Sequence, residues 1–323
     1  MQFYEFKSTM IPSTHTPIMA LCALLFATPA LSHSHQGHTT PNQALRIATW
    51  NIEHLSASDE TGCKPRKAKE IKALTKYAQA LNADVIALQE VASAAAVSQV
   101  FSDKHWHIVM SDRADSKTYT CRKSGNDSTQ QKVAFVVKKP LTIDKVVQHS
   151  TFSTIKPGLR NGLEIQLSYQ GKALHLLNVH LKSGCFVDDY KRSDKEACKI
   201  LSQQAPILDN WVEKKAKAQA NFIVLGDFNH RLTAPYNRLS RDLYYPQGAA
   251  NAHPNNMDKA PVFNANQMLT GCHPYYPAPI DHILVAKSMK ENYQAGSAQF
   301  HYFADMTPDN MLADHCALSI DLK

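Results

Sequence analysis

The sequence predicts a single α/β domain in which two β-sheets are covered by helices. Apolar strand patterns and amphipathic helix patterns follow one another from residue 44 onward, and a chain of this kind buries its sheets by covering them with helices. This part of the chain shows no internal repeat, no linker and no shift in composition. The 323 residues are 44% hydrophobic and 20% charged, which is ordinary globular composition.

Residues 1–32 have the pattern of a secretory signal peptide, and residues 33–43 that of a solvated leader. The apolar run 18–27 is too short to cross a bilayer. Small residues that suit a signal peptidase follow it: Thr28, Ala30 and Ser32. Positive charge before the run is weak, so initiation at Met10 or an imperfect signal are alternatives. We expect a periplasmic or secreted monomer, folded over residues 44–323, with no stable membrane insertion.

The cysteines fit export. Removing the signal peptide deletes Cys22 and leaves six of the seven cysteines, in a compartment where disulfides persist. Six cysteines allow fifteen pairings. Short spacing and shared element ends favour Cys63 with Cys121, Cys185 with Cys198, and Cys272 with Cys316. Free buried thiols are one alternative, and a zinc site is a weaker one because no Cys-x-x-Cys pair is present.

The formal net charge of +7 favours polyanionic partners. A positive balance attracts nucleic acid or anionic lipid and says nothing about the fold. The charge therefore raises the expectation of such a substrate without choosing between them.

Secondary-structure patterns can be followed along the whole of this domain. Strand patterns occupy 44–55, 83–91, 107–110, 133–137, 160–167, 172–183, 221–227 and 279–285, and the chain closes on 311–321. One helical pattern follows the basic segment 63–70 and runs to about Leu81, and another runs from about Ala197 to Ala218. The segment 233–270 is polar and rich in turn residues, with no sheet pattern.

Several of these strands end on polar residues that suit phosphate chemistry. The residues are Asn51, Glu90, His180, Asp227, Asn229, Asp281, Asp314 and His315. Carboxylate and amide oxygens are hard ligands that suit Mg²⁺, Mn²⁺ or Ca²⁺, and histidine transfers protons near neutral pH. Each residue taken singly is more often structural, and Gly226-Asp-Phe-Asn229 alone is more often a turn. Their joint occurrence at strand ends favours a site.

The motifs that carry these residues resemble those of the endonuclease/exonuclease/phosphatase superfamily, which has the deoxyribonuclease I-like fold. The motifs are Thr49-Trp-Asn51, Leu88-Gln-Glu90, Asn178-Val-His-Leu181, Gly226-Asp-Phe-Asn229, Ile280-Asp-His-Ile283 and Ala313-Asp-His315. They occur in this order over most of residues 45–322 and look like a secreted bacterial-type nuclease branch. The resemblance implies a four-layer α/β/β/α sandwich of two packed mixed β-sheets, with residues 44–323 as the catalytic domain.

The resemblance also implies a role for each matching residue. Glu90 holds Mg²⁺, with Asn51 and Asp314 as further ligands or supporting groups. His315, oriented by Asp281, activates water or contacts the scissile phosphate, and Asp227 is a base, a second metal ligand or an orienting group.

Three further residues are assigned to the substrate by the same resemblance. Asn229 contacts a phosphate oxygen, Arg160 grips the substrate phosphate, and His180 is a candidate acid for the leaving oxygen. One position departs from deoxyribonuclease I, where a glutamate pairs with the residue that matches His180. The nearest residue here is Gln131, which would fix the ring without raising its basicity. His230 and His282, beside motif residues, are expected to be structural.

The favoured function is an exported Mg²⁺-dependent endonuclease that cuts DNA with little sequence preference, with DNA favoured over RNA. Arg160, the net charge and the basic segments 64–69 and 113–123 support it. The alternative is a sphingomyelinase-like phospholipase C or another small phosphodiesterase or phosphatase, with Tyr275 and Tyr276 as the nearest candidates for a membrane contact. A binding module on a dead scaffold is disfavoured because the expected catalytic residues are all present.

Overall fold

The computed structural model describes residues 44–244, 260–303, 306–307 and 310–323, all of which belong to one compact unit. The predicted signal peptide and leader, residues 1–43, lie outside the described residues. Among the helices of the described residues, none is long and apolar enough to span a bilayer.

The described chain builds two six-stranded sheets. The first has the order β11-β12-β1-β2-β4-β3 and the second the order β5-β6-β7-β8-β10-β9. The strands of the first sheet are β1 (Leu45–Leu55), β2 (Val85–Val91), β3 (Trp106–Met110), β4 (Lys132–Lys138), β11 (Gln299–Phe300) and β12 (Leu318–Leu322). Those of the second are β5 (Lys145–His149), β6 (Gly162–Tyr169), β7 (Lys172–His180), β8 (Asn221–Asp227), β9 (Val262–Asn264) and β10 (Asp281–Ala286). Each sheet is mixed, because β1–β2 and β7–β8 are parallel while the other pairs are antiparallel.

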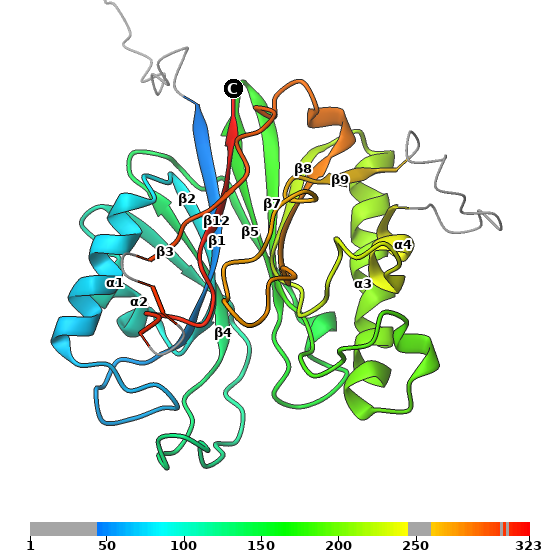
Figure 1. The fold of residues 1–323 in the computed structure, drawn as a ribbon. Coiled ribbons are helices and arrows are strands. Elements are labelled where there is room, and N and C mark those ends of the chain that lie inside the picture. The colour runs from blue at the N-terminus through cyan, green and yellow to red at the C-terminus, as the bar shows by residue number, and fades with distance from the viewer. Residues whose placement is uncertain (1–43, 245–259, 304–305, 308–309) are drawn as a thin grey trace, which may run out of the picture. The chain divides into compact units, whose positions relative to one another are not determined.

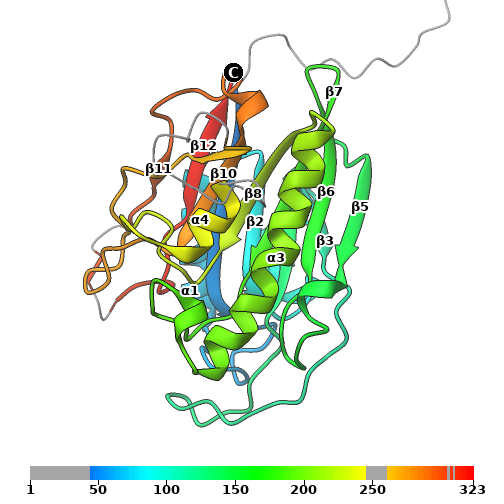
Figure 2. The ribbon, with the colours of Figure 1, turned by 90° about the vertical axis from the view of Figure 1, so that its right-hand side faces the viewer.

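Helices cover the outer face of each sheet (Figure 1). Figure 1 shows α1 and α2 beside the first sheet and α3 and α4 beside the second, and Figure 2 shows α3 running along the strands of its sheet. The helices are α1 (Ala68–Ala80), α2 (Ala94–Val100), α3 (Glu196–Lys217) and α4 (Arg238–Tyr244), with short 3₁₀ turns at Ser150–Phe152, Tyr190–Arg192 and Lys287–Met289. The predicted four-layer α/β/β/α sandwich is confirmed.

Apolar strands hold the two sheets together. The central strands β1, β2, β7 and β8 are apolar on both faces, since one face packs on the other sheet and the other on helices. A buried polar bridge also joins the sheets. Asn178 on β7 donates to the carbonyls of Leu88 (3.0 Å) and Ala134 (2.8 Å) and accepts from Gln89 (2.8 Å). Because its partners all lie on the first sheet, Asn178 sets how the two sheets align.

The structure adds elements that the sequence patterns did not indicate. Within 233–270, where no sheet strand was expected, α4 and the three-residue β9 form, and α2, β5 and β11 were not predicted either. These elements are short, and β9 gains its partner only from β10, about twenty residues later, so local periodicity carries little signal for them. The last strand begins at Leu318, so Asp314 and His315 lie in the loop before it.

All three predicted disulfides are present. Cys63 bonds Cys121, Cys185 bonds Cys198, and Cys272 bonds Cys316. The first joins two basic loops, the second fixes the loop after β7 to α3, and the third ties the loop before β10 to the residue after His315.

A buried carboxylate anchors α3 to the second sheet. Glu164 on β6 is 4% exposed and binds four side chains: Trp211 (3.0 Å) and Lys215 (2.6 Å) from α3, and His149 and His175 (2.8 Å each) from the sheet. Burial alone would raise the pKa of Glu164, but its bonds to His149, Lys215 and Trp211 hold the pKa well below its usual range.

We expect Glu164→Gln to lower the free energy of unfolding by about 3 kcal/mol at pH 7, because it leaves the largely buried ammonium of Lys215 without its counter-charge. A carboxylate with a lowered pKa stabilises the fold above its unfolded pKa of about 4.3 and loses this effect as the pH falls. The difference between wild type and variant should therefore shrink below that pH. Urea unfolding at pH 7 and pH 3 measures it, and an equal difference at both values would contradict the assignment.

Candidate active site

The site forms where strands of both sheets end, and Gly226 is the residue that allows it. Gly226 has φ of +143°, and a Cβ at this position would lie 2.0 Å from the carbonyl oxygen of Val179 on β7. No side chain fits that space. The glycine of the Gly-Asp-Phe-Asn motif therefore lets β8 lie close against β7 as the strand delivers Asp227.

Strand register places three predicted residues in a row. Asp227 at the end of β8 is directly opposite His180 on β7 and Asp281 on β10. Asn229, with φ of +51°, closes the turn. Its backbone N–H donates to Asp227 Oδ1 (2.7 Å), and its Nδ2 donates to Asp227 Oδ2 (3.1 Å) and to the carbonyl of Leu181 (3.2 Å).

Asn51 connects this row to the first sheet. Its Nδ2 lies between two carboxylates, 3.0 Å from Asp227 Oδ2 and 3.3 Å from Glu90 Oε1. Its Oδ1 accepts the backbone N–H of Glu53 (3.0 Å). In this structure Asn51 is thus a spacer that donates to both acids, and its oxygen is already engaged.

Glu90 sits in a strained turn. Its φ is +61°, and the ladders on both sides of it are irregular between Leu88 and Val91 and between Asn51 and Leu55. Such strain in a non-glycine residue is typical of functional sites. Burial alone would raise the pKa of Glu90, but the positive charges of His54 and Arg160 lower it. Glu90 is therefore an ionised carboxylate at the edge of the site.

His315 and Asp281 form a close pair. His315 Nδ1 lies 2.7 Å from Asp281 Oδ2, and Trp50 Nε1 donates to the His315 carbonyl (3.2 Å). His315 Nε2 is free to face Asp227 Oδ2 (4.0 Å) and Asp314 Oδ1 (3.8 Å). Burial alone would lower the pKa of His315, but the surrounding carboxylates, Asp281 first, raise it well above its ordinary value. The surrounding carboxylates therefore favour the imidazolium form of His315.

His180 has the opposite character. Its Nε2 accepts from the guanidinium of Arg160, and it lies 3.4 Å from Asp227 Oδ2 and 3.8 Å from Glu90 Oε1. Burial and then the charge of Arg160 hold the pKa of His180 well below its ordinary value. A neutral His180 that accepts from Arg160 orients that cation and has no proton on Nε2 to give.

The prediction that Gln131 stands beside His180 is wrong. The Gln131 amide instead lies 3.2 Å from His54 Nε2. The left-handed conformation of Glu53 and His54 turns the end of β1 so that the His54 ring fills this place, and His54 in turn lies 3.5 Å from Glu90 Oε2.

Asp227 is the most perturbed acid of the site. Burial, and then the charge of Asp281 directly opposite, raise the pKa of Asp227 to about 7, although His315 opposes the shift. An acid of this kind can gain or lose a proton near neutral pH.

Two groups of acidic side chains border the site. The first is the acidic edge, which we define as Glu53, Glu90 and Asp314. Asp314 is half exposed there, and its backbone N–H donates to Glu53 Oε2 (2.9 Å). The second is Asp227, Asp281 and His315, whose ligand atoms lie within 4.8 Å of one another, the metal-binding spacing that the described residues show. The acidic edge offers carboxylates alone, which are the ligands that a hard cation prefers, whereas in the second group Nδ1 of His315 already pairs with Asp281.

Two neighbours of the site were not assigned roles from the sequence. The salt bridge of Glu53 to Lys64 and its contact with Asp314 place Glu53 on the acidic edge. His54 had no signal beyond its place after Glu53. Of the two other histidines, buried His282 lies between Asn264 (3.2 Å) and the carbonyl of His230 (3.0 Å), and Nε2 of buried His230 has no hydrogen-bond partner among the described residues.

Comparison with known proteins decides the family. A model described as the Endonuclease/Exonuclease/phosphatase family matches residues 48–295. The chain belongs to the endonuclease/exonuclease/phosphatase family. No curated protein shows a significant sequence match to this family member.

Solved structures share the fold of this endonuclease/exonuclease/phosphatase protein. Each of three examples covers 87% of the chain. A humanized D. rerio TDP2 is 14% identical, with TM-score 0.57 over 99% of its own length. The human Nocturnin catalytic domain with bound sulfate is 17% identical, with TM-score 0.54 over 94% of its length. A family member from Bacteroides vulgatus is 13% identical, with TM-score 0.55 over 99% of its length.

We expect Asp281→Asn to lower the pKa of His315, because the substitution removes the charge that favours the imidazolium. In the EDTA-treated wild type, His315 should keep its proton as the pH rises past 6.5, whereas in the variant it should lose the proton at lower pH. Histidine ring resonances followed by NMR measure this, and His315→Ala identifies the signal by its disappearance. An unchanged titration in Asp281→Asn would refute the pairing.

Proposed function

We propose that this protein is an exported, Mg²⁺-dependent phosphodiesterase that cuts DNA as an endonuclease. The observation that supports it best is the cluster around Asn51, where ionised Glu90, Asp227 of raised pKa and the His315–Asp281 pair meet. Displacement at a phosphodiester needs charge stabilisation and two proton transfers, and this cluster contains groups for each. The three disulfides support the export part of the proposal.

The substrate phosphate is held by Asn229 and Arg160 in this account. Arg160 is buried, it contacts His180, and its Nε has no hydrogen-bond partner among the described residues. A buried guanidinium with unused donors suits an anion. Neutral His180 keeps the guanidinium aimed at the site, so we assign it a positioning role rather than that of leaving-group acid.

Proton transfer falls to His315 and Asp227. His315 Nε2 faces the site and Asp281 holds its other nitrogen, so the ring can present one proton in a fixed direction. Asp227, with its pKa near 7, can take a proton from water at the pH where His315 is charged. Mg²⁺, held by Glu90 and Asp314 of the acidic edge, would neutralise charge on the phosphate oxygens. Asn51 would support the site as a spacer between the two acids.

Exposed cations favour nucleic acid. Not every predicted basic residue is available, because Lys64 pairs with Glu53 and Arg66 donates to backbone carbonyls. Lys117, Arg122 and Lys123 remain exposed on the loop joined by Cys121 to Cys63. Tyr119 of this loop lies near Glu90, whose charge adds to burial in raising the Tyr119 pKa, so these cations flank the site. A D. rerio TDP2 of 16% identity and TM-score 0.56 is described in complex with a single strand DNA product.

A sphingomyelinase-like phospholipase C is the second candidate. Tyr275 and Tyr276 are each 70% exposed on the loop that Cys272 ties to Cys316, next to His315. An exposed aromatic pair at this place can touch either a lipid surface or a nucleobase.

A substrate panel separates these functions. We expect the purified protein to linearise and then degrade circular plasmid DNA with Mg²⁺, to act more slowly on RNA, and to leave sphingomyelin vesicles intact, with EDTA abolishing all cutting. Gel electrophoresis and phosphocholine release are the measurements. Hydrolysis of sphingomyelin with intact plasmid would select the second candidate.

His315→Ala should lower kcat on DNA by about 10²–10⁴-fold, because a general acid or base contributes that much. His180→Ala should act mainly on KM, because His180 orients the phosphate-binding Arg160. Steady-state kinetics at several DNA concentrations measures both. Wild-type kcat in His315→Ala would remove His315 from the mechanism.

A further inference from the structure

An exposed aromatic ring stands on a rigid support beside the site. Phe186 is 67% exposed, whereas its neighbour Cys185 is fully buried and bonded to Cys198 at the start of α3. Most large apolar side chains of this domain are buried. The disulfide therefore fixes the backbone beside Phe186, whose phenyl ring is exposed to solvent instead of packing in the core.

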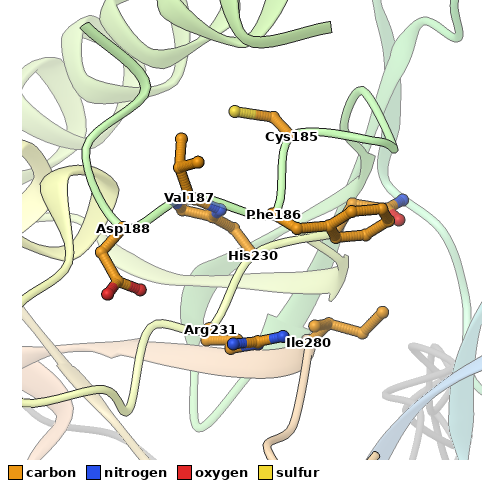
Figure 3. Close-up of a pocket in the computed structure, with 8 residues that line it drawn as sticks. Cys185, Phe186, Val187, Asp188, His230, Arg231 and Ile280 are labelled. Atoms are coloured by element: carbon orange, nitrogen blue, oxygen red, sulfur yellow. The ribbon is translucent and has the colours of Figure 1, made fainter. Parts of the chain in front are cut away.

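Phe186 borders a small, partly open pocket that shares Asn229 with the catalytic turn. The pocket has room for about one water molecule and is lined in part by Phe186, Asn229, Arg231 and Ile280. Figure 3 shows that Phe186 enters from the segment after Cys185, while Arg231 and Ile280 come from other segments. Asn229 belongs to both the pocket and the catalytic turn, and Ile280 directly precedes Asp281.

Arg231 supplies a cation to the same pocket. It is exposed, and no carboxylate of the described residues lies within ion-pair distance of its guanidinium. Asp188 also lines the pocket without pairing with it. An exposed guanidinium two residues from Asn229 is well placed for a phosphate adjacent to the one being cut.

We propose that this pocket is a nucleotide subsite, in which an unpaired base of the substrate strand stacks on Phe186 while Arg231 binds the neighbouring phosphate. The inference rests on the proposed nuclease function and names the form of nucleic acid the site takes. The pocket is far too small to enclose a base, since sites that hold a whole small molecule measure roughly 300–1,000 Å³. The base therefore lies over its mouth, on the exposed ring of Phe186, and the phosphate lies against exposed Arg231.

The proposal predicts a preference for single strands. Both faces of a base inside a duplex are covered by its neighbours, so a ring such as Phe186 can stack only on a base that has left the helix. Stacking of this kind tolerates any base, which is consistent with little sequence preference.

The experiment compares single-stranded trinucleotides in which one base at a time is replaced by an abasic deoxyribose, cut with Mg²⁺ and resolved by mass. In the wild type, loss of one particular base should lower kcat/KM about tenfold. In Phe186→Ala the intact trinucleotide should be cut at that lower rate, and loss of the same base should change nothing further. Phe186→Trp should restore the dependence, whereas Phe186→Leu, which keeps apolar bulk, should not.

Arg231→Gln should lower kcat/KM by the same factor for intact and abasic trinucleotides. The slope of log(kcat/KM) against log salt concentration should become shallower by about one, because one phosphate contact is lost. Arg231→Lys should be intermediate. Two controls should behave as wild type. Val146→Ala removes an exposed apolar group on the outer strand β5, and Lys217→Ala removes a cation at the end of α3 that precedes β8.

Each outcome decides between the two claims. If the wild type cuts neither plasmid nor long single strands, the proposed nuclease function fails. If it cuts them, two results would refute the subsite alone. One is that removal of the base lowers kcat/KM by the same factor in the wild type and in Phe186→Ala. The other is that duplex and single-stranded DNA of one sequence are cut at equal rates. If Phe186→Ala instead weakens only binding to sphingomyelin vesicles, the ring is a lipid contact and the subsite is also refuted.

Discussion

The structure depends on one amide placed between two acids. The Nδ2 of Asn51 donates to Glu90 from the first sheet and to Asp227 from the second, and without a donor there the two carboxylates would repel one another at the junction of the sheets. Other features bring the acids to that amide. Gly226 lets β8 approach β7, the left-handed turn at Glu90 points its carboxylate inward, and Asn178 aligns the two sheets.

The site divides into three chemical regions around this amide. The acidic edge brings the carboxylates of Glu53, Glu90 and Asp314 to one side of the site, and we assign the hard cation to it. In the group of Asp281, His315 and Asp227, Asp281 fixes one nitrogen of the ring and leaves the other to face Asp227 at 4.0 Å, and we propose that this group transfers protons. The third region is Arg160 with neutral His180, to which we assign the substrate phosphate. We thus assign different tasks to the acidic edge and to Arg160, although groups of opposite charge lie close together in the site.

Much of the fold and most of the site residues could be predicted from the sequence, and the reasons are physical. Strands such as β2 and β8 are continuous apolar runs that end on polar groups, so both the strand and the residue at its end are visible locally. The pairing of Arg160 with His180, the His54–Gln131 contact and the spacer role of Asn51 depend on side-chain directions set by register and by left-handed turns. Short elements such as β9 depend on distant partners for the same reason.

We propose that the acidic edge binds the cation and that the group of Asp227, Asp281 and His315 transfers protons. Anomalous scattering from a crystal soaked in Mn²⁺ tests this division most directly. The account predicts an anomalous peak against the carboxylate of Glu90, on the side of Asp314, with the Asp281–His315 hydrogen bond intact. A peak lying only among Asp227, Asp281 and His315, with that bond broken, would contradict it.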